Sequence, residues 1–587
     1  MSLQLSLHSS LAVSKIPGRR LSRRVALAAL VTTLTVTMLP ATLAQAATPT
    51  WSSTIEIPGL ATASSGNAVV NAVWCVSTGN CIAGGQYNDA SGGQQAFIDN
   101  EVNGTWGSAV TLAASLNQGG GAAVTSIACG GVGDCRAVGY YTDSTGNEQG
   151  FVVDDSQSIG APVEITGTVN VTDAQGDGFA ELADISCGAS GVCAAGGLTT
   201  DTSLNQQAMV VDYKNGAWGT PQVVPGIVAL NTGGFSFIDS ISCTSAGDCT
   251  ASGGYAVGTT QIVAFVVEET NGTWGSAEAI PGFTTLAPTG LSLSGSVSCS
   301  SPGNCSVGGD YVDSFNNTQA FLATEVNGTW GQAFKVAGLD VLNVGNTAAI
   351  GSISCPANGE CSAGGVYTDK VGVQQAFVVD ETKGTWGSAQ QVTGTESVDA
   401  PGAAVTALTC TTAGNCLAGG HYATGPKQSQ SFVVQETGGV WGAAMIETNS
   451  AALNVGLIST VTALGCSADG GCAVGGVYTD ASSLAQASVD NLNAPPITPP
   501  SQPQAVRVTP VSKGLKVSWH APSSDGGSPI TAYTVKVSPG SRSCTTSALT
   551  CTIKGLNPKT RYSVVVTAKN VKGVGRTSAR SGAVKPK

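Results

Sequence analysis

Residues 350–392 of this 587-residue chain have the sequence IGSISCPANGECSAGGVYTDKVGVQQAFVVDETKGTWGSAQQV. The two cysteines lie six positions apart, with a glycine two positions before the second, and this arrangement occurs eight times in the chain. The period is about 55 residues, and repeats of this length build propeller blades, solenoid coils or strings of domains. The repeat therefore restricts the architecture before any single side chain is considered.

Each repeat contains four short segments that are typical of β-strands. In the stretch quoted above they cover residues 350–354, 361–367, 375–380 and 386–392. A two-residue turn joins the third and fourth segments, and in four repeats it is Asn-Gly, which predicts a hairpin because both central residues need positive φ. A tryptophan follows the turn, and we interpret it as a packing residue because it recurs at Trp106, Trp218, Trp274, Trp330, Trp386 and Trp441.

The two ends of the array complement each other. The segment from Trp51 to Gly59 matches the fourth strand of a repeat, such as Trp274 to Gly282, while the eighth repeat ends near Asn493 without such a strand. The N-terminal strand is therefore expected to complete the last repeat. The sequence predicts an all-β protein whose array resembles a secreted, eight-bladed β-propeller with four-stranded blades and one disulfide per blade. The alternative is two smaller packed arrays.

A propeller of this kind has one constant and one variable face. The loops between the two cysteines and the turns between strands three and four would share one face, and their lengths hardly vary. The connections from each fourth strand to the next repeat would lie on the opposite face, and these differ in every repeat. Because function often resides in variable loops on a rigid scaffold, we expect any ligand to bind there.

The first 46 residues have the features of an export signal. Arg19, Arg20, Arg23 and Arg24 precede an apolar run from Val25 to Leu39, and Ala44-Gln45-Ala46 offers a cleavage site with small residues. The sequence predicts a signal peptide over residues 1–46 and a secreted or cell-surface protein with no stable membrane-spanning segment after cleavage. An uncleaved membrane anchor is the alternative, and the choice between general secretory and twin-arginine export stays open.

The eighteen cysteines fall into nine close pairs. Disulfides persist in oxidising compartments, whereas zinc sites usually have cysteines closer together, often with histidine. The spacing therefore predicts disulfides Cys75–Cys81, Cys129–Cys135, Cys187–Cys193, Cys243–Cys249, Cys299–Cys305, Cys355–Cys361, Cys410–Cys416, Cys466–Cys472 and Cys544–Cys551.

Charge divides the chain after the signal into two parts. The net charge of the whole chain is −12; residues 47–494 carry six basic residues against 36 acids, while residues 495–587 carry fourteen against one. A proline-rich stretch separates the two parts. The predicted organisation is an eight-repeat propeller over 47–494, a linker over 495–503 and a second domain over 504–587.

The second domain resembles the fibronectin type III family over about 85 residues. Trp519 matches the buried tryptophan of the second strand, and the stretch from Gly555 to Tyr562 matches the tyrosine corner. The resemblance implies an immunoglobulin-like β-sandwich that serves as a spacer or binding module in bacterial exported proteins, often next to polysaccharide-degrading enzymes. Cys544 and Cys551 depart from most relatives, and we expect them to staple a hairpin.

Candidate catalytic and metal-binding residues are few. Downstream of the signal there are two histidines, and His421 is interpreted as a surface strand residue because its position varies between repeats. Most acids recur with the repeat and are interpreted as structural, so no catalytic residue and no cofactor is predicted. The calcium candidates are Asp173, Asp177 and Glu181 in the longest variable loop, with a solvated acidic loop as the alternative. The same two interpretations apply to the aspartates after strand two: Asp89, Asp143, Asp313 and Asp369.

The sequence favours a non-catalytic, monomeric binding or adhesion protein. Its partner would be an extracellular glycan, a cell-wall polymer or a protein. The basic second domain would serve as spacer or cell-wall attachment, or would dock on the acidic propeller of its own chain. Nucleic acid is not expected, because the basic residues lack interleaved aromatic residues. The alternative is a glycoside hydrolase, or a carbohydrate-binding accessory protein of such an enzyme.

Overall fold

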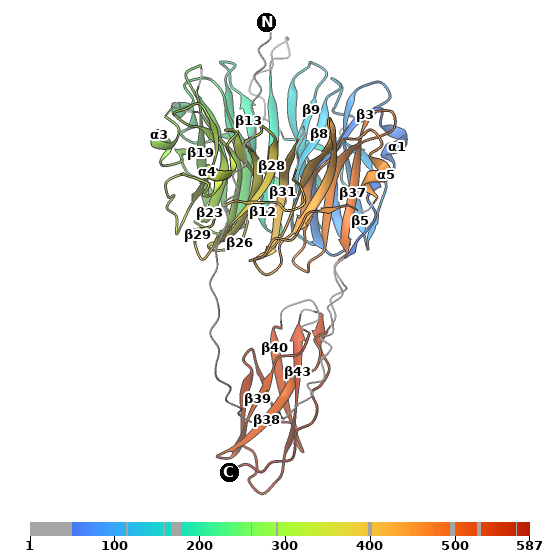
Figure 1. Ribbon diagram of the computed structural model, residues 1–587, viewed down its shortest axis with the longest axis vertical. Coiled ribbons are helices and arrows are strands. Elements are labelled where there is room, and N and C mark those ends of the chain that lie inside the picture. The colour runs from blue at the N-terminus through green and yellow to red at the C-terminus, as the bar shows by residue number, and fades with distance from the viewer. Residues whose placement is uncertain are drawn as a thin grey trace, which may run out of the picture. The chain divides into compact units, whose positions relative to one another are not determined.

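The computed structural model describes residues 50–587 except 113–114, 156–158, 166–177, 260, 289–290, 397–401, 448, 494–498, 525–529 and 571 (Figure 1). The predicted signal peptide and part of the predicted linker lie outside the described residues. Within the described ranges no helix is long and apolar enough to cross a membrane.

Residues 50–493 form eight antiparallel sheets, numbered here in chain order. Sheet 1 consists of β3 (Gly66–Ser77), β4 (Asn80–Asn88), β5 (Gln94–Val102), β6 (Thr105–Trp106) and β7 (Val110–Leu112). Sheet 2 consists of β8 (Ala122–Gly131), β9 (Asp134–Thr142), β10 (Glu148–Asp155) and β11 (Val163–Glu164). Sheet 3 consists of β12 (Ala180–Ala189), β13 (Val192–Thr200), β14 (Gln206–Lys214), β15 (Ala217–Trp218) and β16 (Gln222–Val223). Sheet 4 consists of β17 (Ser236–Ser245), β18 (Asp248–Val257), β19 (Gln261–Thr270), β20 (Thr273–Trp274) and β21 (Glu278–Ala279).

The other four sheets repeat this plan. Sheet 5 consists of β22 (Ser292–Ser301), β23 (Asn304–Val312), β24 (Thr318–Thr324) and β25 (Phe334–Lys335). Sheet 6 consists of β26 (Ala348–Ala357), β27 (Glu360–Thr368), β28 (Gln374–Thr382), β29 (Thr385–Trp386) and β30 (Gln390–Gln391). Sheet 7 consists of β31 (Ala403–Thr412), β32 (Asn415–Gly425), β33 (Gln428–Gln435) and β34 (Met445–Ile446). Sheet 8 consists of β35 (Ser459–Cys466), β36 (Cys472–Thr479), β37 (Ala485–Asn493), β1 (Thr50–Trp51) and β2 (Ile55–Glu56). Four-residue helices precede the first strands of five sheets: α1 (Leu60–Ala63), α2 (Ile227–Leu230), α3 (Phe283–Leu286), α4 (Leu339–Leu342) and α5 (Ser450–Leu453).

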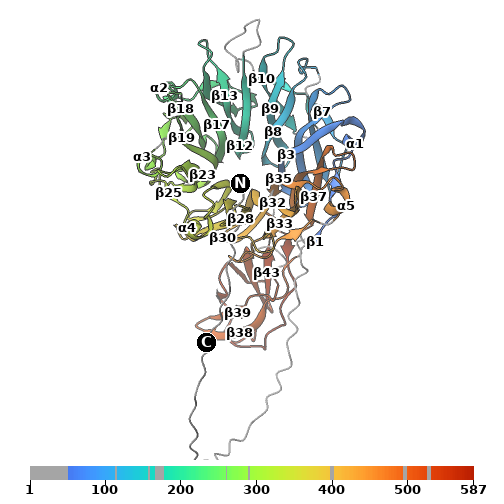
Figure 2. The same cartoon turned by 45° about the horizontal axis from the view of Figure 1, so that its top comes forward.

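Neighbouring sheets pack through their first strands. β3 contacts β8, and the same contact continues through β12, β17, β22, β26, β31 and β35. The series returns to its start, since β35 of sheet 8 also contacts β3 of sheet 1. In Figure 2 the first strands lie nearest the middle of the array and the short outer strands lie at its periphery.

The N-terminal strands belong to the last sheet. β1 and β2 both pair antiparallel with β37, in the register Trp51 to Leu492 and Ile55 to Val489. Ser52 Oγ donates to Asp490 Oδ1 at 2.5 Å, which adds a side-chain link to the backbone pairing. The chain therefore joins its first and last repeats in one sheet, as the complementary ends of the array predict.

In six of the eight sheets a Gly-Gly step in the second strand allows the sheet to approach the next, while sheets 2 and 4 have Val138 and Ser252 at the first of these two positions. A Cβ on Gly364 of β27 would lie 2.5 Å from Val405 Cγ1 of sheet 7. A Cβ on Gly365 would lie 2.0 Å from the carbonyl oxygen of Ala349, beside a register shift between Ile350 and Ser352. The bulge explains the crowding, because it turns an extra backbone group of the first strand towards the second.

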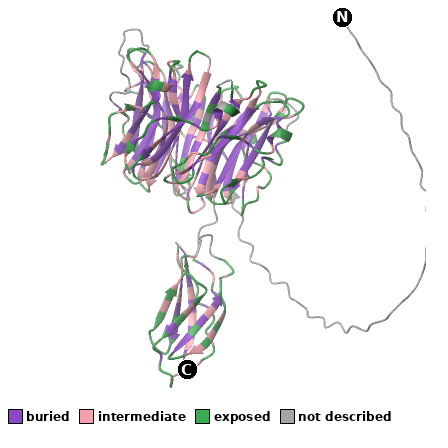
Figure 3. Ribbon diagram, turned by 90° about the vertical axis from the view of Figure 1, so that its left-hand side faces the viewer, coloured by how far each residue is buried: buried purple, intermediate pink, exposed green. Residues whose placement is uncertain are grey.

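The apolar core lies between the sheets. The third strands of six sheets carry a phenylalanine that is fully buried: Phe97, Phe151, Phe265, Phe321, Phe377 and Phe432. Figure 3 shows that buried residues follow the sheet interiors while exposed residues lie mainly in the loops. Each cluster joins two successive sheets; one includes Val70 of sheet 1 and Val489 of sheet 8.

Eight disulfides link the ends of the first and second strands in these sheets, at the predicted pairs, with Cα atoms 3.9–4.1 Å apart. The predicted Asn-Gly turn lies against this loop, since Gly104 N donates to Gly79 O at 2.8 Å. Asn103 and Gly104 both have positive φ, as this turn requires. Disulfide loops and hairpin turns therefore share one side of the array, called here the disulfide side.

The C-terminal part of the chain forms two further sheets. One consists of β38 (Gln504–Val511), β39 (Gly514–His520) and β42 (Thr550–Lys554), and the other of β41 (Ser543–Thr546), β40 (Ala532–Ser538), β43 (Ser563–Asn570) and β44 (Gly573–Val574). Trp519 is buried, and the backbone N–H of Asn557 donates to Tyr562 Oη at 3.2 Å, which is the geometry of a tyrosine corner.

The interpretation of the ninth disulfide as a hairpin staple is wrong. Cys544 lies in β41 and Cys551 in β42, and these strands belong to different sheets. The short connection between the cysteines crosses from one sheet to the other, which sequence spacing does not distinguish from a hairpin turn. The bond therefore joins the two halves of the domain.

Candidate functional site: an acidic cavity between sheets 6 and 7

The structure does not test the predicted calcium site, because two of its three residues lie outside the described part of the chain. Asp173 and Asp177 lie outside the described residues, whereas Glu181 lies in β12, where burial raises the pKa of its carboxyl group. Among the residues that the structure describes, no group of three or more histidine, cysteine, aspartate or glutamate side chains is arranged to hold a metal ion.

The aspartates after strand two are engaged by their own loops. Asp369 Oδ1 accepts hydrogen bonds from the backbone N–H groups of Val371 and Val373, and Oδ2 accepts one from Gln375 Nε2 at 3.0 Å. Asp89, Asp143, Asp201, Asp313 and Asp480 repeat this arrangement. Their oxygens close the turns, which is a sufficient reason for their recurrence.

The two candidate histidines lie apart, in different domains. His421 in β32 is half-buried rather than exposed, because it packs towards the neighbouring sheet, where its Nδ1 lies 3.3 Å from Thr460 Oγ1. Burial lowers the pKa of His421. His520 is exposed in β39.

The recurring acids at the end of the third strand occupy two positions that differ in their surroundings. The first position accepts a hydrogen bond from the tryptophan of the next sheet: Trp274 Nε1 donates to Asp212, Trp330 Nε1 to Glu268, and Trp441 Nε1 to Asp380. The second position, one residue later, is opposite the tryptophan of its own sheet and is glutamate in five of the eight sheets: Glu101, Glu269, Glu325, Glu381 and Glu436. The tryptophans therefore link successive sheets, which confirms that they are packing residues.

Two of these sheet interfaces contain a cation from the chain itself. Lys214 Nζ lies 3.1 Å from Asp212 Oδ2 and 2.7 Å from Glu269 Oε1, and so bridges sheets 3 and 4. Arg136 pairs with Asp134 and Asp154 of sheet 2, and its guanidinium group lies 3.8 Å from the centre of the Tyr213 ring of sheet 3. The acids at these interfaces are thereby compensated.

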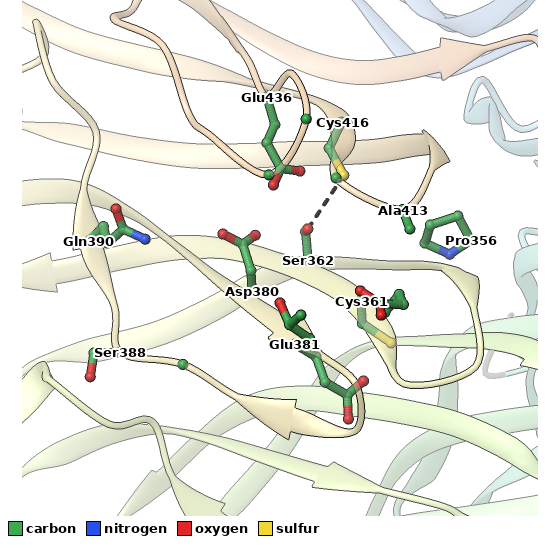
Figure 4. A pocket seen from close by; sticks show the side chains of 16 residues that line it. Pro356, Cys361, Ser362, Asp380, Glu381, Ser388, Gln390, Ala413, Cys416 and Glu436 are labelled. Carbon is green, nitrogen blue, oxygen red and sulfur yellow. Dashed lines mark hydrogen bonds between the residues drawn. The ribbon is translucent and has the colours of Figure 1, made fainter. Parts of the chain in front are cut away.

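A cavity of about 460 Å³ lies between sheets 6 and 7 on the disulfide side (Figure 4). Asp380 and Glu381 reach it from β28, Glu360 from β27, and Glu436 from the end of sheet 7's third strand. Figure 4 shows the carboxyl groups of Asp380 and Glu436 on facing sides of the gap. Three of the other cavities among the described residues also lie between sheets on this side.

Burial and mutual repulsion perturb the acids of this cavity. Burial, together with the negative charge of Asp380, raises the pKa of Glu436 to about 7. Burial also raises the pKa of Asp380, although hydrogen bonds from Trp441 and Ser362 oppose the shift. Glu436 is only 2% exposed, and its Oε2 has no hydrogen-bond partner. The cavity therefore holds an uncompensated acidic pair.

Sequence reasoning treated these acids as one structural set and missed their two positions. A signal was present in the repeat alignment, because the residue after the glutamate position is Lys214 in sheet 3 but Thr382 in sheet 6. The alignment alone does not reveal that these side chains face an acid of the following sheet.

The match to a protein family concerns the C-terminal domain. Residues 498–583 match the family model of the fibronectin type III domain, and this part of the chain is such a domain. No curated protein matches the chain.

Similar solved structures cover about 15% of this chain. They include the twitchin kinase region from C. elegans (24% identity, 15% of this chain and 17% of that chain, TM-score 0.15). A structure of titin kinase and its flanking domains has 29% identity over 15% of this chain and 17% of that chain, with TM-score 0.14. The FN5 domain of Drosophila Lar has 30% identity over 15% of this chain and 96% of that chain, with TM-score 0.13. The chain thus spans about a sixth of the first two.

Proposed function

We propose that the protein is a secreted or cell-surface, non-catalytic binding protein. Residues 47–494 form an eight-bladed β-propeller, and residues 504–587 form a fibronectin type III module that serves as spacer or cell-wall attachment. The contact of β35 with β3 and the pairing of β1 with β37 support a closed ring. The disulfides and the fibronectin type III domain are consistent with an extracellular location.

An apolar patch on the side opposite the disulfides carries the proposal of binding. Phe315 and Val371, at the loops after strand two of sheets 5 and 6, are 83% and 70% exposed. Val341 and Val344, in the connection between these sheets, are 78% and 54% exposed. The connection runs between the two loops, since Thr318 N donates to Asn346 O and Gly345 N to Thr368 O. Exposed apolar patches on soluble proteins often mark interaction sites.

A binding screen with the mature protein tests this function. Glycan arrays and cell-wall preparations serve as probes, and Phe315→Ser is compared with Ser482→Ala, a change in the equivalent loop of sheet 8. We expect binding without release of reducing sugar, weakened by Phe315→Ser and unaffected by Ser482→Ala. Binding whose affinity neither substitution alters contradicts the assignment of the apolar patch as the binding site.

A glycoside hydrolase is the second candidate, and Asp380 with Glu436 is the pair that favours it. Glycosidases use two opposed carboxyl groups, one with a raised pKa. Similar acidic pairs recur between other sheets, as Asp212 with Glu269, which favours a role in packing over catalysis. Reducing-sugar release that is abolished by Glu436→Gln would establish the enzyme instead.

A further inference from the structure

Lys214 shows how an ammonium group is held between two sheets of this fold. Lys214 donates to Asp212 of its own sheet and to Glu269 of the next, while Trp274 Nε1 donates to the other oxygen of Asp212 at 3.0 Å. Two carboxylates and an indole therefore form a cradle, and the ammonium enters it on an alkyl chain. The Glu269 side chain is 1% exposed.

Sheets 6 and 7 repeat the acids of this cradle without its cation. Asp380 occupies the position of Asp212, and Trp441 Nε1 donates to its oxygens at 3.1 and 2.9 Å. Glu436 occupies the position of Glu269, since each lies opposite the tryptophan of its own sheet. Thr382 stands where sheet 3 has Lys214, because Thr382 pairs with Thr385 as Lys214 pairs with Ala217.

The space that a lysine side chain would need is present at this interface. The cavity of about 460 Å³ is lined by Asp380, Thr382 and Glu436. Glu436 Oε2 has no partner although the residue is 98% buried. A buried carboxyl group without a partner is costly, and a hydrogen-bonded cation removes that cost.

The interface between sheets 4 and 5 also has acids at both of these positions. Its acids are Glu268 and Glu325, and burial, together with the negative charge of Glu268, raises the pKa of Glu325. Glu325 does not line either of the cavities described at this interface. The accessible cradle is thus the one between sheets 6 and 7.

We propose that the cavity between sheets 6 and 7 binds a primary ammonium group on an unbranched alkyl chain, such as a lysine side chain, between Asp380 and Glu436. The ammonium donates to both carboxylates as Lys214 does within the chain. The site lies on the disulfide side and is independent of the apolar patch. A lysine of another molecule and a lysine of the basic C-terminal domain offer the same chemistry.

Titration calorimetry of the mature protein tests the cradle. The probe is Nα-acetyl-lysine methylamide, and the matched control is Nα-acetyl-norleucine methylamide, which keeps the alkyl chain without the ammonium. We expect the lysine derivative to bind about ten-fold or more tightly than the norleucine derivative, as charge-assisted hydrogen bonds imply. Equal affinities, or no binding of the lysine derivative by protein in which Glu436 forms no cross-link to a lysine of its own chain, overturn the proposal.

Three variants localise the site. Glu436→Gln is expected to weaken binding about ten-fold, and Thr382→Lys to abolish it, because the new side chain fills the cradle from within. Glu278→Gln, which removes an exposed acid from sheet 4, is the control and should bind normally. Thermal melting curves verify that each variant folds. Binding that persists in folded Thr382→Lys protein overturns the proposal.

Two further measurements test whether the two cradles are equivalent and which molecule supplies the amine. Lys214→Thr gives sheet 3 the residue that sheet 6 has at Thr382, so the cradle of Asp212 and Glu269 loses its ammonium and the alkyl chain that fills it, and the stoichiometry of lysine binding should rise from one to two. Unchanged stoichiometry in a folded variant contradicts the equivalence of the two cradles. Carbodiimide coupling without added amine, followed by peptide mapping, shows whether Glu436 already contacts a lysine of this chain. A Glu436 cross-link within 504–587 identifies the C-terminal domain as the source, and coupling only to added lysine identifies an external one.

Discussion

Replacement of Gly475 by alanine tests whether the eighth sheet packs against the first. Gly475 lies in β36, and a Cβ there would lie 2.4 Å from Val70 Cγ1 and 2.8 Å from Val73 Cγ2, both of β3. Ordinary contacts begin at 3.4 Å, so the sheets must separate by about 1 Å or the valines must change rotamer. Overpacking of this size costs about 1–3 kcal/mol. The change from glycine to alanine also stabilises the folded state by about 0.4–1 kcal/mol, because alanine lowers the conformational entropy of the unfolded chain. We therefore expect a net destabilisation of about 1–2 kcal/mol.

Urea unfolding followed by tryptophan fluorescence measures this effect. Gly364→Ala is the reference, because it creates a 2.5 Å contact with Val405 between sheets 6 and 7, which are consecutive in any array. Gly582→Ala is the control, since its Cβ would meet no atom within 4 Å. The double variant Gly475→Ala/Val70→Ala should recover part of the loss, because contacting residues show non-additive effects. If Gly475→Ala is as stable as the parent while Gly364→Ala is destabilised, the closed ring is refuted.

Three further predictions concern the buried acids and the cross-links. Burial, together with a neighbouring aspartate, raises the pKa of Glu447 from 4.5 to about 7. The folded state therefore holds this proton more tightly than the unfolded state, and stability falls as pH rises from about 4.5 through 7. Glu447→Gln should remove up to about 3 kcal/mol of that decline in denaturation curves recorded from pH 4.5 to 8, and an unchanged slope would contradict the assignment. Trp441→Phe removes the indole N–H that donates to both oxygens of Asp380, so we expect a loss of about 1–2 kcal/mol by urea unfolding and a further rise in the pKa of Asp380 by carboxyl-carbon NMR. Replacing Cys355 and Cys361 together with serine should lower stability by about 2 kcal/mol, because the bond closes a short loop in the unfolded chain; a larger loss would indicate that the bond also supports the turn beside it.

The sequence by itself determined the local structure, because the signals involved are local. Cysteine spacing predicts which strands end together, and the Asn-Gly pairs predict where the chain reverses, since Asn103 and Gly104 need positive φ. The matching ends of the array predict the pairing of Trp51 with the last repeat. Trp519 and Tyr562 predict the fibronectin type III domain in the same way, through residues whose roles depend on their own strands.

Only the tertiary structure decided which side chains meet between sheets. Trp441 and Asp380 are about sixty positions apart, as are Lys214 and Glu269, and the repeat period conceals that each pair consists of neighbours. The assignment of Cys544 and Cys551 to a hairpin failed for a related reason, since spacing along the chain does not show which sheet receives a strand. Burial of Glu436 beside Asp380, without the lysine that serves Glu269, is a property of two sheets brought together. The electrostatic energy depends on the distances between these groups and on their exclusion from water, and both arise only when the sheets pack.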